Sequence, residues 1–369
     1  MNFQSRRRVA FQIAALVAAI TALPAWAHDE DGLRAGKVFT SSNSPGGNEL
    51  LVFAPQAGGA LSLVARAATQ GQGTGAGLGS QGAVTLSSDG RHAFVVNALS
   101  HTVSTFAIRD GGITLSSVVD SGGLQPISVT EHEGLVYVLN AGGAGNVAGF
   151  RMQQGRLTLI AGSSRGLSAA SGTAPAQVGF GADGDVIVVT EKATNRILSY
   201  PVRRDGTLGA MVVTASSGAT PFGFAFDRRD HLIVSEAPGS AASSYRFDER
   251  SAVPTLISAS VPNTQGAACW VAVTPNGRYA YTGNAATSNV SSYRINRAGR
   301  IELASAVAGV TGPNAGTTDL AVSTDGRRLF AVAPRSLQIV AFRIGADGSL
   351  ASLGAVSGLP AGFAGLAAN

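Results

Sequence analysis

Short apolar runs alternate with polar turn sequences along most of the chain, in a pattern typical of repeated β-hairpins. The runs Ala83–Leu86 and Ala93–Val96 flank one such turn, and similar pairs of runs flank the others. The turns carry a recurring doublet, at Asp89-Gly90, Glu133-Gly134, Asp183-Gly184, Asn276-Gly277 and Asp325-Gly326, with Arg229-Asp230 in the remaining gap. Asp-Gly and Asn-Gly favour the positive φ angles of tight hairpins. The 236 residues from 89 to 325 cover five intervals, so one repeat takes about 47 residues (236/5).

A third apolar run in each repeat carries one aromatic residue at the same place. These residues are Phe53, Phe106, Phe150, Tyr200, Tyr245, Tyr293 and Phe342. A weaker fourth run follows each of them, so the pattern predicts seven units of four antiparallel strands. Such repeats indicate an all-β protein, a seven-bladed β-propeller.

The first repeat begins directly at Lys37 and lacks its innermost strand. The end of the chain, Pro360–Ala364, matches the start of the fifth unit's first strand, Pro221–Ala225. We therefore expect the C-terminal strand to complete the first blade and close the ring, which removes exposed sheet edges. A Gly-rich stretch, Gly71–Gly82, is expected to be a flexible connection between the first two blades.

The N-terminus has the form of an export signal. Three arginines, Arg6 to Arg8, precede an apolar run that ends in Ala25-Trp26-Ala27, an A-x-A cleavage site. The predicted domains are a signal peptide (1–27), a leader (28–36) and a propeller (37–369), and the expected location is the bacterial periplasm or the medium. Export by the general or the twin-arginine route is left open. The apolar run is too short to be a membrane span.

Cleavage would change the charge balance. The whole chain has 27 Lys and Arg against 22 Asp and Glu, a net charge of +5. Without Arg6, Arg7 and Arg8 the balance is 24 against 22, or +2, and no basic run remains. We therefore expect no nucleic-acid partner. Cys269 is the single cysteine, so no disulfide can form within the chain.

The sequence of the repeats resembles that of the YVTN and lactonase-type seven-bladed propellers, which include 6-phosphogluconolactonase-like and carboxymuconate cyclase-like proteins. The resemblance covers residues 37–369 and rests on phrases such as Ser88–Asn97 and Pro275–Tyr281. It implies a propeller fold and an enzyme that hydrolyses or isomerises a small sugar-acid or related lactone at the channel mouth; a hydrolase of this kind would be a lactonase-like carboxylic ester hydrolase. Members of this group include both enzymes and binding proteins.

The residue that leaves the second strand is the best candidate for chemistry at the channel mouth. In the seven repeats this residue is Asn43, Asn97, Asn140, Glu191, Glu236, Asn284 and Ala333. Asparagine suits a turn, but Glu191 and Glu236 break the pattern in neighbouring blades. Two carboxylates there can act as acid and base, bind a cation or hold sugar hydroxyls. The alternative is that both are solvated loop residues, paired with Lys192, Arg196 or Arg335.

The family resemblance favours Glu191 further. Lactonase-like members often have a Pro-Arg-His phrase before a hairpin whose second strand ends in Val-Asn-Glu; here the Glu is Glu191, but Ala176 and Gln177 replace Arg and His. We predict Glu191 and Glu236 as catalytic residues, and as substrate-binding residues Gln177, Arg335, Asn97, Asn140, Asn284 and His101. No spacing resembles a zinc site, so we expect no metal and no cofactor.

The competing interpretation is a non-catalytic propeller that binds a protein, a glycan or a small ligand through its loops. It is motivated by the missing Arg and His and by the small polar loops. In either case we expect a monomer.

Overall fold

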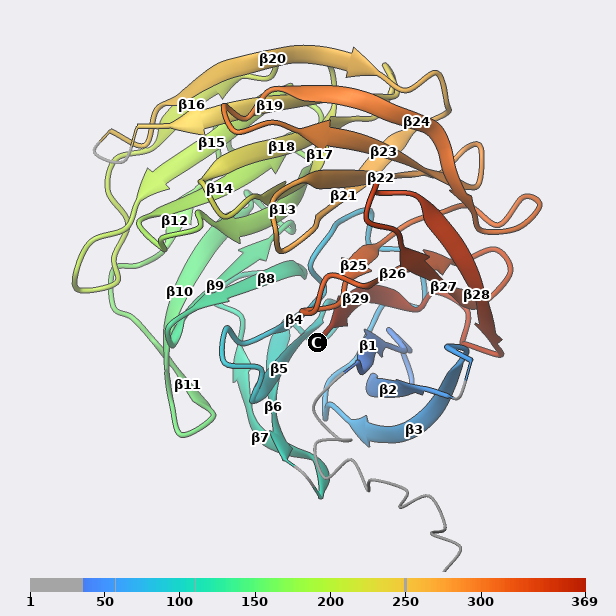
Figure 1. Ribbon diagram of the computed structural model, residues 1–369. Helices are drawn as coiled ribbons and strands as arrows, with labels where there is room; N and C mark the ends of the chain where they lie inside the picture. Colours follow the sequence, from blue (N-terminus) through green and yellow to red (C-terminus); the bar gives the residue numbers. More distant parts are fainter. Residues whose placement is uncertain (1–35, 57, 110, 249–250) are drawn as a thin grey trace, which may run out of the picture. The chain divides into compact units, whose positions relative to one another are not determined.

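The computed structural model describes residues 36–56, 58–109, 111–248 and 251–369, all within one compact unit of the chain, residues 33–369. The predicted signal peptide and, apart from Gly36, the leader lie outside the described residues. The described residues form 29 β-strands in seven antiparallel sheets (Figure 1), and no helix occurs among them. None of them forms a helix able to cross a membrane.

Each sheet is one blade, with its strands ordered from the central channel outward. Blade 1 contains β29 (Ala364–Ala368), β1 (Val38–Ser41), β2 (Glu49–Pro55) and β3 (Leu61–Ala68). Blade 2 contains β4 (Val84–Leu86), β5 (His92–Asn97), β6 (Thr102–Arg109) and β7 (Gly112–Asp120). Blade 3 contains β8 (Pro126–His132), β9 (Leu135–Asn140), β10 (Asn146–Gln153) and β11 (Arg156–Leu159), with the short β12 (Arg165–Gly166) also paired to β10.

The remaining blades repeat this order. Blade 4 contains β13 (Pro175–Phe180), β14 (Val186–Glu191), β15 (Arg196–Pro201) and β16 (Val212–Ala215). Blade 5 contains β17 (Pro221–Phe226), β18 (His231–Glu236), β19 (Ala241–Phe247) and β20 (Pro254–Pro262). Blade 6 contains β21 (Ala268–Val273), β22 (Tyr279–Asn284), β23 (Asn289–Ile295) and β24 (Ile301–Val310). Blade 7 contains β25 (Leu320–Val322), β26 (Arg328–Ala333), β27 (Gln338–Ile344) and β28 (Leu350–Ser357).

The innermost strands form a closed ring. They contact one another in the order β4, β8, β13, β17, β21, β25 and β29, and β29 contacts β4. The C-terminal strand therefore occupies the inner position of blade 1, as the sequence predicts. It pairs antiparallel with β1, and the Thr40 hydroxyl donates to the Gly365 carbonyl at 2.6 Å. The prediction of a seven-bladed propeller closed by its last strand is confirmed.

Packing between blades depends on the aromatic residues of the third strands. All seven are at most 3% exposed, so each lies in the apolar layer between sheets. The hairpin turns follow the predicted doublets. At Asp89-Gly90 the glycine has a φ of +68°, and the Asp89 carboxylate accepts the N–H of Arg91 at 2.9 Å. The side chain of the doublet thus fixes the turn that joins the first two strands of a blade.

The Gly-rich stretch, expected to be flexible, is instead held by specific contacts. The N–H groups of Gly73 and Gly75 donate to the carbonyls of Ser44 and Asn43. A Cβ on Gly73 would lie 2.2 Å from the backbone carbon of Asn43, so only glycine fits this approach. The glycines here serve close packing of main chain on main chain.

Candidate active site at the channel mouth

Five residues within the inner strands or directly before them occupy one level of the channel. Ala83, Ser128, Gln177, Trp270 and Asp319 each lie opposite the residue that precedes the end of the second strand in their own blade. The second strands end at the predicted Asn and Glu positions, so this level lies just inside the mouth. Its members differ in chemistry from blade to blade, which breaks the symmetry of the ring.

The Gly-rich stretch crosses this mouth and joins blades on different sides of it. The backbone N–H of Gln81 donates to Ala176 of blade 4 at 3.1 Å. Its side-chain amide accepts the N–H of Val271 at 3.0 Å and donates to the Val271 carbonyl at 2.7 Å, both in blade 6. The Trp270 indole N–H donates to the Ser80 carbonyl at 2.9 Å. Residues 79–82 therefore act as a cross-brace inside the ring.

A pocket of about 280 Å³ remains beside this brace. Its walls are Gly77–Ser80, Trp270, Thr318, Asp319, Pro334, Phe363 and Ala364. Most of these side chains are apolar, and Asp319 is 6% exposed. Burial raises the pKa of the Asp319 carboxyl to about 7, against the effect of a hydrogen bond from the Gly365 backbone. The pocket thus holds a carboxyl group that changes its charge near neutral pH.

A lysine that follows the second strand of blade 4 contacts the brace. The Lys192 ammonium donates to the Gly79 carbonyl at 2.5 Å and sits 4.8 Å from the centre of the Phe222 ring. Burial lowers the pKa of this amine. Burial raises the pKa of the neighbouring Cys269 thiol to about 12, so the thiol stays neutral and unreactive.

The two predicted catalytic glutamates are buried and hydrogen bonded to loops. Glu191 accepts the N–H of Ser168 at 2.8 Å, and its other oxygen accepts the hydroxyls of Ser168 and Thr194. Glu236 accepts the N–H of Gly218 at 2.8 Å and the Ser260 hydroxyl. Among the described residues, no hydrogen bond or ion pair joins the two carboxylates. Each fastens a loop to the end of a second strand.

The asparagines at the same repeat position act similarly. Asn97 donates to Thr102 and Ser104 of β6 in its own blade and accepts from Asn48 of blade 1. Asn140 donates to the Ser121 carbonyl. Asn284 donates to Asn289 and Ser291 and accepts from Asn263. All three asparagines are fully buried.

The remaining predicted binding residues lie in different surroundings. Gln177 lies on the channel level, where its amide bonds both the N–H and the carbonyl of Phe224 in the next blade. Arg335 is exposed and donates to Asn314 at 3.0 Å, while His101 accepts the N–H of Gln125 at 3.0 Å. The structure does not bring all six into one pocket, and their roles in binding stay predictions.

Asp319 and Trp270 were missed in the sequence. The signal was present, since Asp319 falls where the second repeat has Ala83, directly before a short apolar strand. A carboxylate at that point of an apolar inner strand departs from the repeat as clearly as Glu191 does. Among the described residues, no group of three His, Cys, Asp or Glu side chains could hold a metal ion.

A model of a known protein family matches part of the chain. Residues 143–266 match the family model described as "Lactonase, 7-bladed beta-propeller". Together with the seven blades, this match confirms the expected resemblance to lactonase-type propellers. No curated protein sequence gives a significant match to the chain.

Solved structures with this fold cover nearly the whole chain. A protein of unknown function from Desulfotomaculum acetoxidans superposes with a TM-score of 0.71 at 14% identity, over 89% of this chain and 98% of that one. A candidate 6-phosphogluconolactonase from Bacteroides uniformis gives 0.68 at 19%, over 90% and 99%. The periplasmic gluconolactonase of Pseudomonas aeruginosa gives 0.67 at 16%, over 89% and 98%. At these identities the likeness concerns the fold.

Proposed function

We propose that the protein hydrolyses a small lactone in the pocket at the channel mouth. The observation that carries this proposal is the buried Asp319 carboxyl in an apolar pocket of about 280 Å³, in a propeller that matches the lactonase family over part of its length. Pockets for small ligands range from roughly 300 to 1,000 Å³, so this one suits a compact ring.

In this proposal Asp319 is the acid and base. A pKa of about 7 gives comparable amounts of carboxylate and carboxylic acid at neutral pH, which is the condition for efficient proton transfer. The carboxylate takes a proton from water as the water oxygen bonds to the lactone carbonyl carbon. The resulting carboxylic acid then returns the proton to the ring oxygen when the C–O bond breaks. Water is consumed, and a hydroxy acid is released.

The Gly-rich wall of the pocket offers hydrogen-bond donors for the oxyanion that forms when water attacks the lactone carbonyl. A main-chain N–H is a common donor to the oxyanion of such a reaction, and the main chain of Gly77–Ser80 borders the pocket. Trp270 gives a flat apolar wall and is fixed by its bond to Ser80. Glu191 and Glu236 are positioning residues in this scheme, because their bonds hold the loops around the mouth.

The test is turnover of a panel of aldonolactones and muconolactones by the purified full chain. We expect hydrolysis with a rate that rises through about pH 7, at least a hundredfold loss of kcat in Asp319→Asn, and a smaller loss in Glu191→Gln. Gln56→Ala, a change at an exposed site in the β2–β3 turn of blade 1, is the control. An unreactive panel, or an Asp319→Asn variant as fast as the wild type, would refute the proposed hydrolase.

The same panel separates the two interpretations of the sequence. A propeller that only binds would hold a lactone without turnover, and Asp319→Asn would then change affinity alone. We also propose export to the periplasm or medium. Fractionation of cells that express the chain with and without residues 1–27 tests it, and equal retention of both in the cytoplasm would contradict it.

A further inference from the structure

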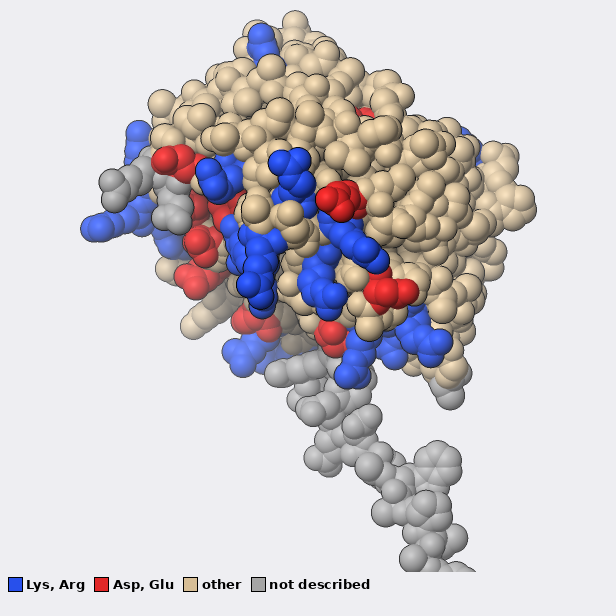
Figure 2. Space-filling view, turned by 45° about the horizontal axis from the view of Figure 1, so that its top comes forward, with Lys and Arg blue, Asp and Glu red and all other residues tan. Residues whose placement is uncertain are grey.

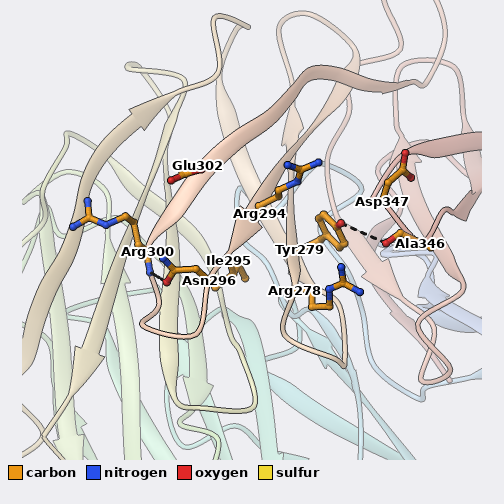
Figure 3. A pocket seen from close by; sticks show the side chains of 9 residues that line it. All are labelled: Arg278, Tyr279, Arg294, Ile295, Asn296, Arg300, Glu302, Ala346 and Asp347. Atoms are coloured by element: carbon orange, nitrogen blue, oxygen red, sulfur yellow. Dashed lines mark hydrogen bonds between the residues drawn. The ribbon is translucent and has the colours of Figure 1, made fainter.

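A second hollow lies at the opposite end of the blades, where the hairpin doublets turn. It has a volume of about 630 Å³ and is bordered by Arg278, Arg294, Arg300, Glu302 and Asp347, with residues of blades 6 and 7 between them. In Figure 3, Arg278 and Arg294 lie on either side of Tyr279, and Arg300 lies beyond Asn296. Figure 2 shows that charged side chains gather on one part of the surface, while large areas carry none.

The three guanidinium groups bring positive charge to the hollow, where Glu302 lies opposite Arg294 in the β23–β24 pair. In the described part of the chain, none of them makes an ion pair within 4 Å. Arg278 is held in place by the Tyr279 ring, whose centre is 5.6 Å from the guanidinium carbon. Guanidinium groups bind phosphate and sulfate through paired N–H donors. The hollow therefore offers donors for an oxyanion.

The two carboxylates narrow the choice of ligand. Glu302 and Asp347 lie on opposite sides of Arg294 in Figure 3. Asp347 accepts the N–H and the hydroxyl of Ser349 at 3.1 and 2.6 Å, and these bonds lower its pKa, so it is ionised at neutral pH. Carboxylates repel a bare anion but accept hydroxyl groups. A ligand that satisfies the whole site carries one oxyanion and several hydroxyls.

We propose that this hollow between blades 6 and 7 binds a saccharide that carries a phosphate or sulfate group. Its volume lies within the range of ligand sites. The site is separate from the channel mouth and does not depend on the lactonase proposal.

The experiment is titration of the full chain with four probes: glucose 6-phosphate, glucose 6-sulfate, glucose and inorganic phosphate. We expect saturable binding of one charged sugar per chain, and at least tenfold weaker binding of both glucose and inorganic phosphate. The ratio of the two charged sugars identifies the preferred anion. Equal affinity for glucose, or for inorganic phosphate alone, would overturn the proposal, as would the absence of saturable binding.

Variants place the binding site. We expect Arg278→Gln and Arg294→Gln each to weaken binding of the charged sugar about tenfold. Arg297→Gln, which removes the same charge from an exposed position in the β23–β24 turn that does not border the hollow, is the matched control and should stay within twofold. Asp319→Asn should also leave affinity unchanged, which separates this site from the channel mouth. Equal weakening by Arg297→Gln, or loss of binding in Asp319→Asn, would refute the assignment.

Discussion

Asp319 gives a stability prediction that does not require a substrate. An aspartate in an unfolded chain has a pKa of about 3.9, and burial raises the pKa of folded Asp319 to about 7. Between these values the folded state binds more protons than the unfolded state. The free energy of unfolding therefore falls as pH rises from about 4 to about 7, and above pH 7 it stays at this lower value. A shift of about 3 pKa units corresponds to a cost of about 4 kcal/mol at high pH.

The assay is urea unfolding of the wild type and Asp319→Asn between pH 5 and pH 8. Asparagine has the same shape but cannot ionise, so the variant lacks this cost. We expect the wild type to lose about 2 to 3 kcal/mol of unfolding free energy relative to the variant across this interval. Asp205→Asn is the control. Hydrogen bonds from Thr207 lower the pKa of this exposed carboxyl, so its contribution to stability changes with pH only below about pH 4 and is constant between pH 5 and pH 8. The reasoning would be refuted if the difference in unfolding free energy between the wild type and Asp319→Asn stayed constant within about 0.5 kcal/mol from pH 5 to pH 8. It would also be refuted if the wild type became more stable relative to the variant as pH rises.

Four further predictions concern the brace, the loops, the ring closure and the thiol. Gln81→Ala should cost about 2 kcal/mol in urea unfolding, because two hydrogen bonds across the channel are lost; Gln56→Ala, at an exposed site, should cost less than about 0.5 kcal/mol. Glu191→Ala should cost about 2 kcal/mol in the same assay, because the half-buried donors of Ser168 and Thr194 lose their acceptor; equal stability would contradict the role of Glu191 in holding the loop. Deletion of residues 364–369 should abolish the cooperative thermal transition seen by circular dichroism, and a sharp transition near the wild-type midpoint would contradict ring closure. Cys269 should react with a thiol reagent at pH 8 only after unfolding, and fast reaction of the native protein would contradict its burial.

The fold could be predicted from the sequence because its signals are local and repeated. A doublet such as Asp89-Gly90 fixes a turn through its own side chain and backbone, and an aromatic such as Phe106 marks the same strand in every blade. The closure of the ring could be predicted as well, because residues 360–364 resemble the residues that begin the inner strand of blade 5.

The site could be predicted only in part, because its properties depend on contacts far apart in sequence. Glu191 departs from the repeat, but its burial comes from Ser168, 23 residues away. Asp319 lies beside the start of the C-terminal strand and the Gly-rich stretch. The repeat pattern predicts the position of the first of these segments but not of the second. Gln81 bonds Val271 across 190 residues. For the same reason, a composition typical of a linker predicted flexibility where the chain forms a brace.

Blade 1 has a consequence for the order of folding. Its inner strand is made of residues 364–368, so β1 has no inward partner until these residues, more than 300 positions later, have been synthesised. Blades 2 to 7 use contiguous segments and can form one after another, whereas the ring closes last by the pairing of β29 with β1. Such non-local closure is slow and leaves an unpaired strand edge exposed meanwhile. A nascent propeller of this kind therefore depends on protection from aggregation most strongly in the interval before β29 pairs with β1.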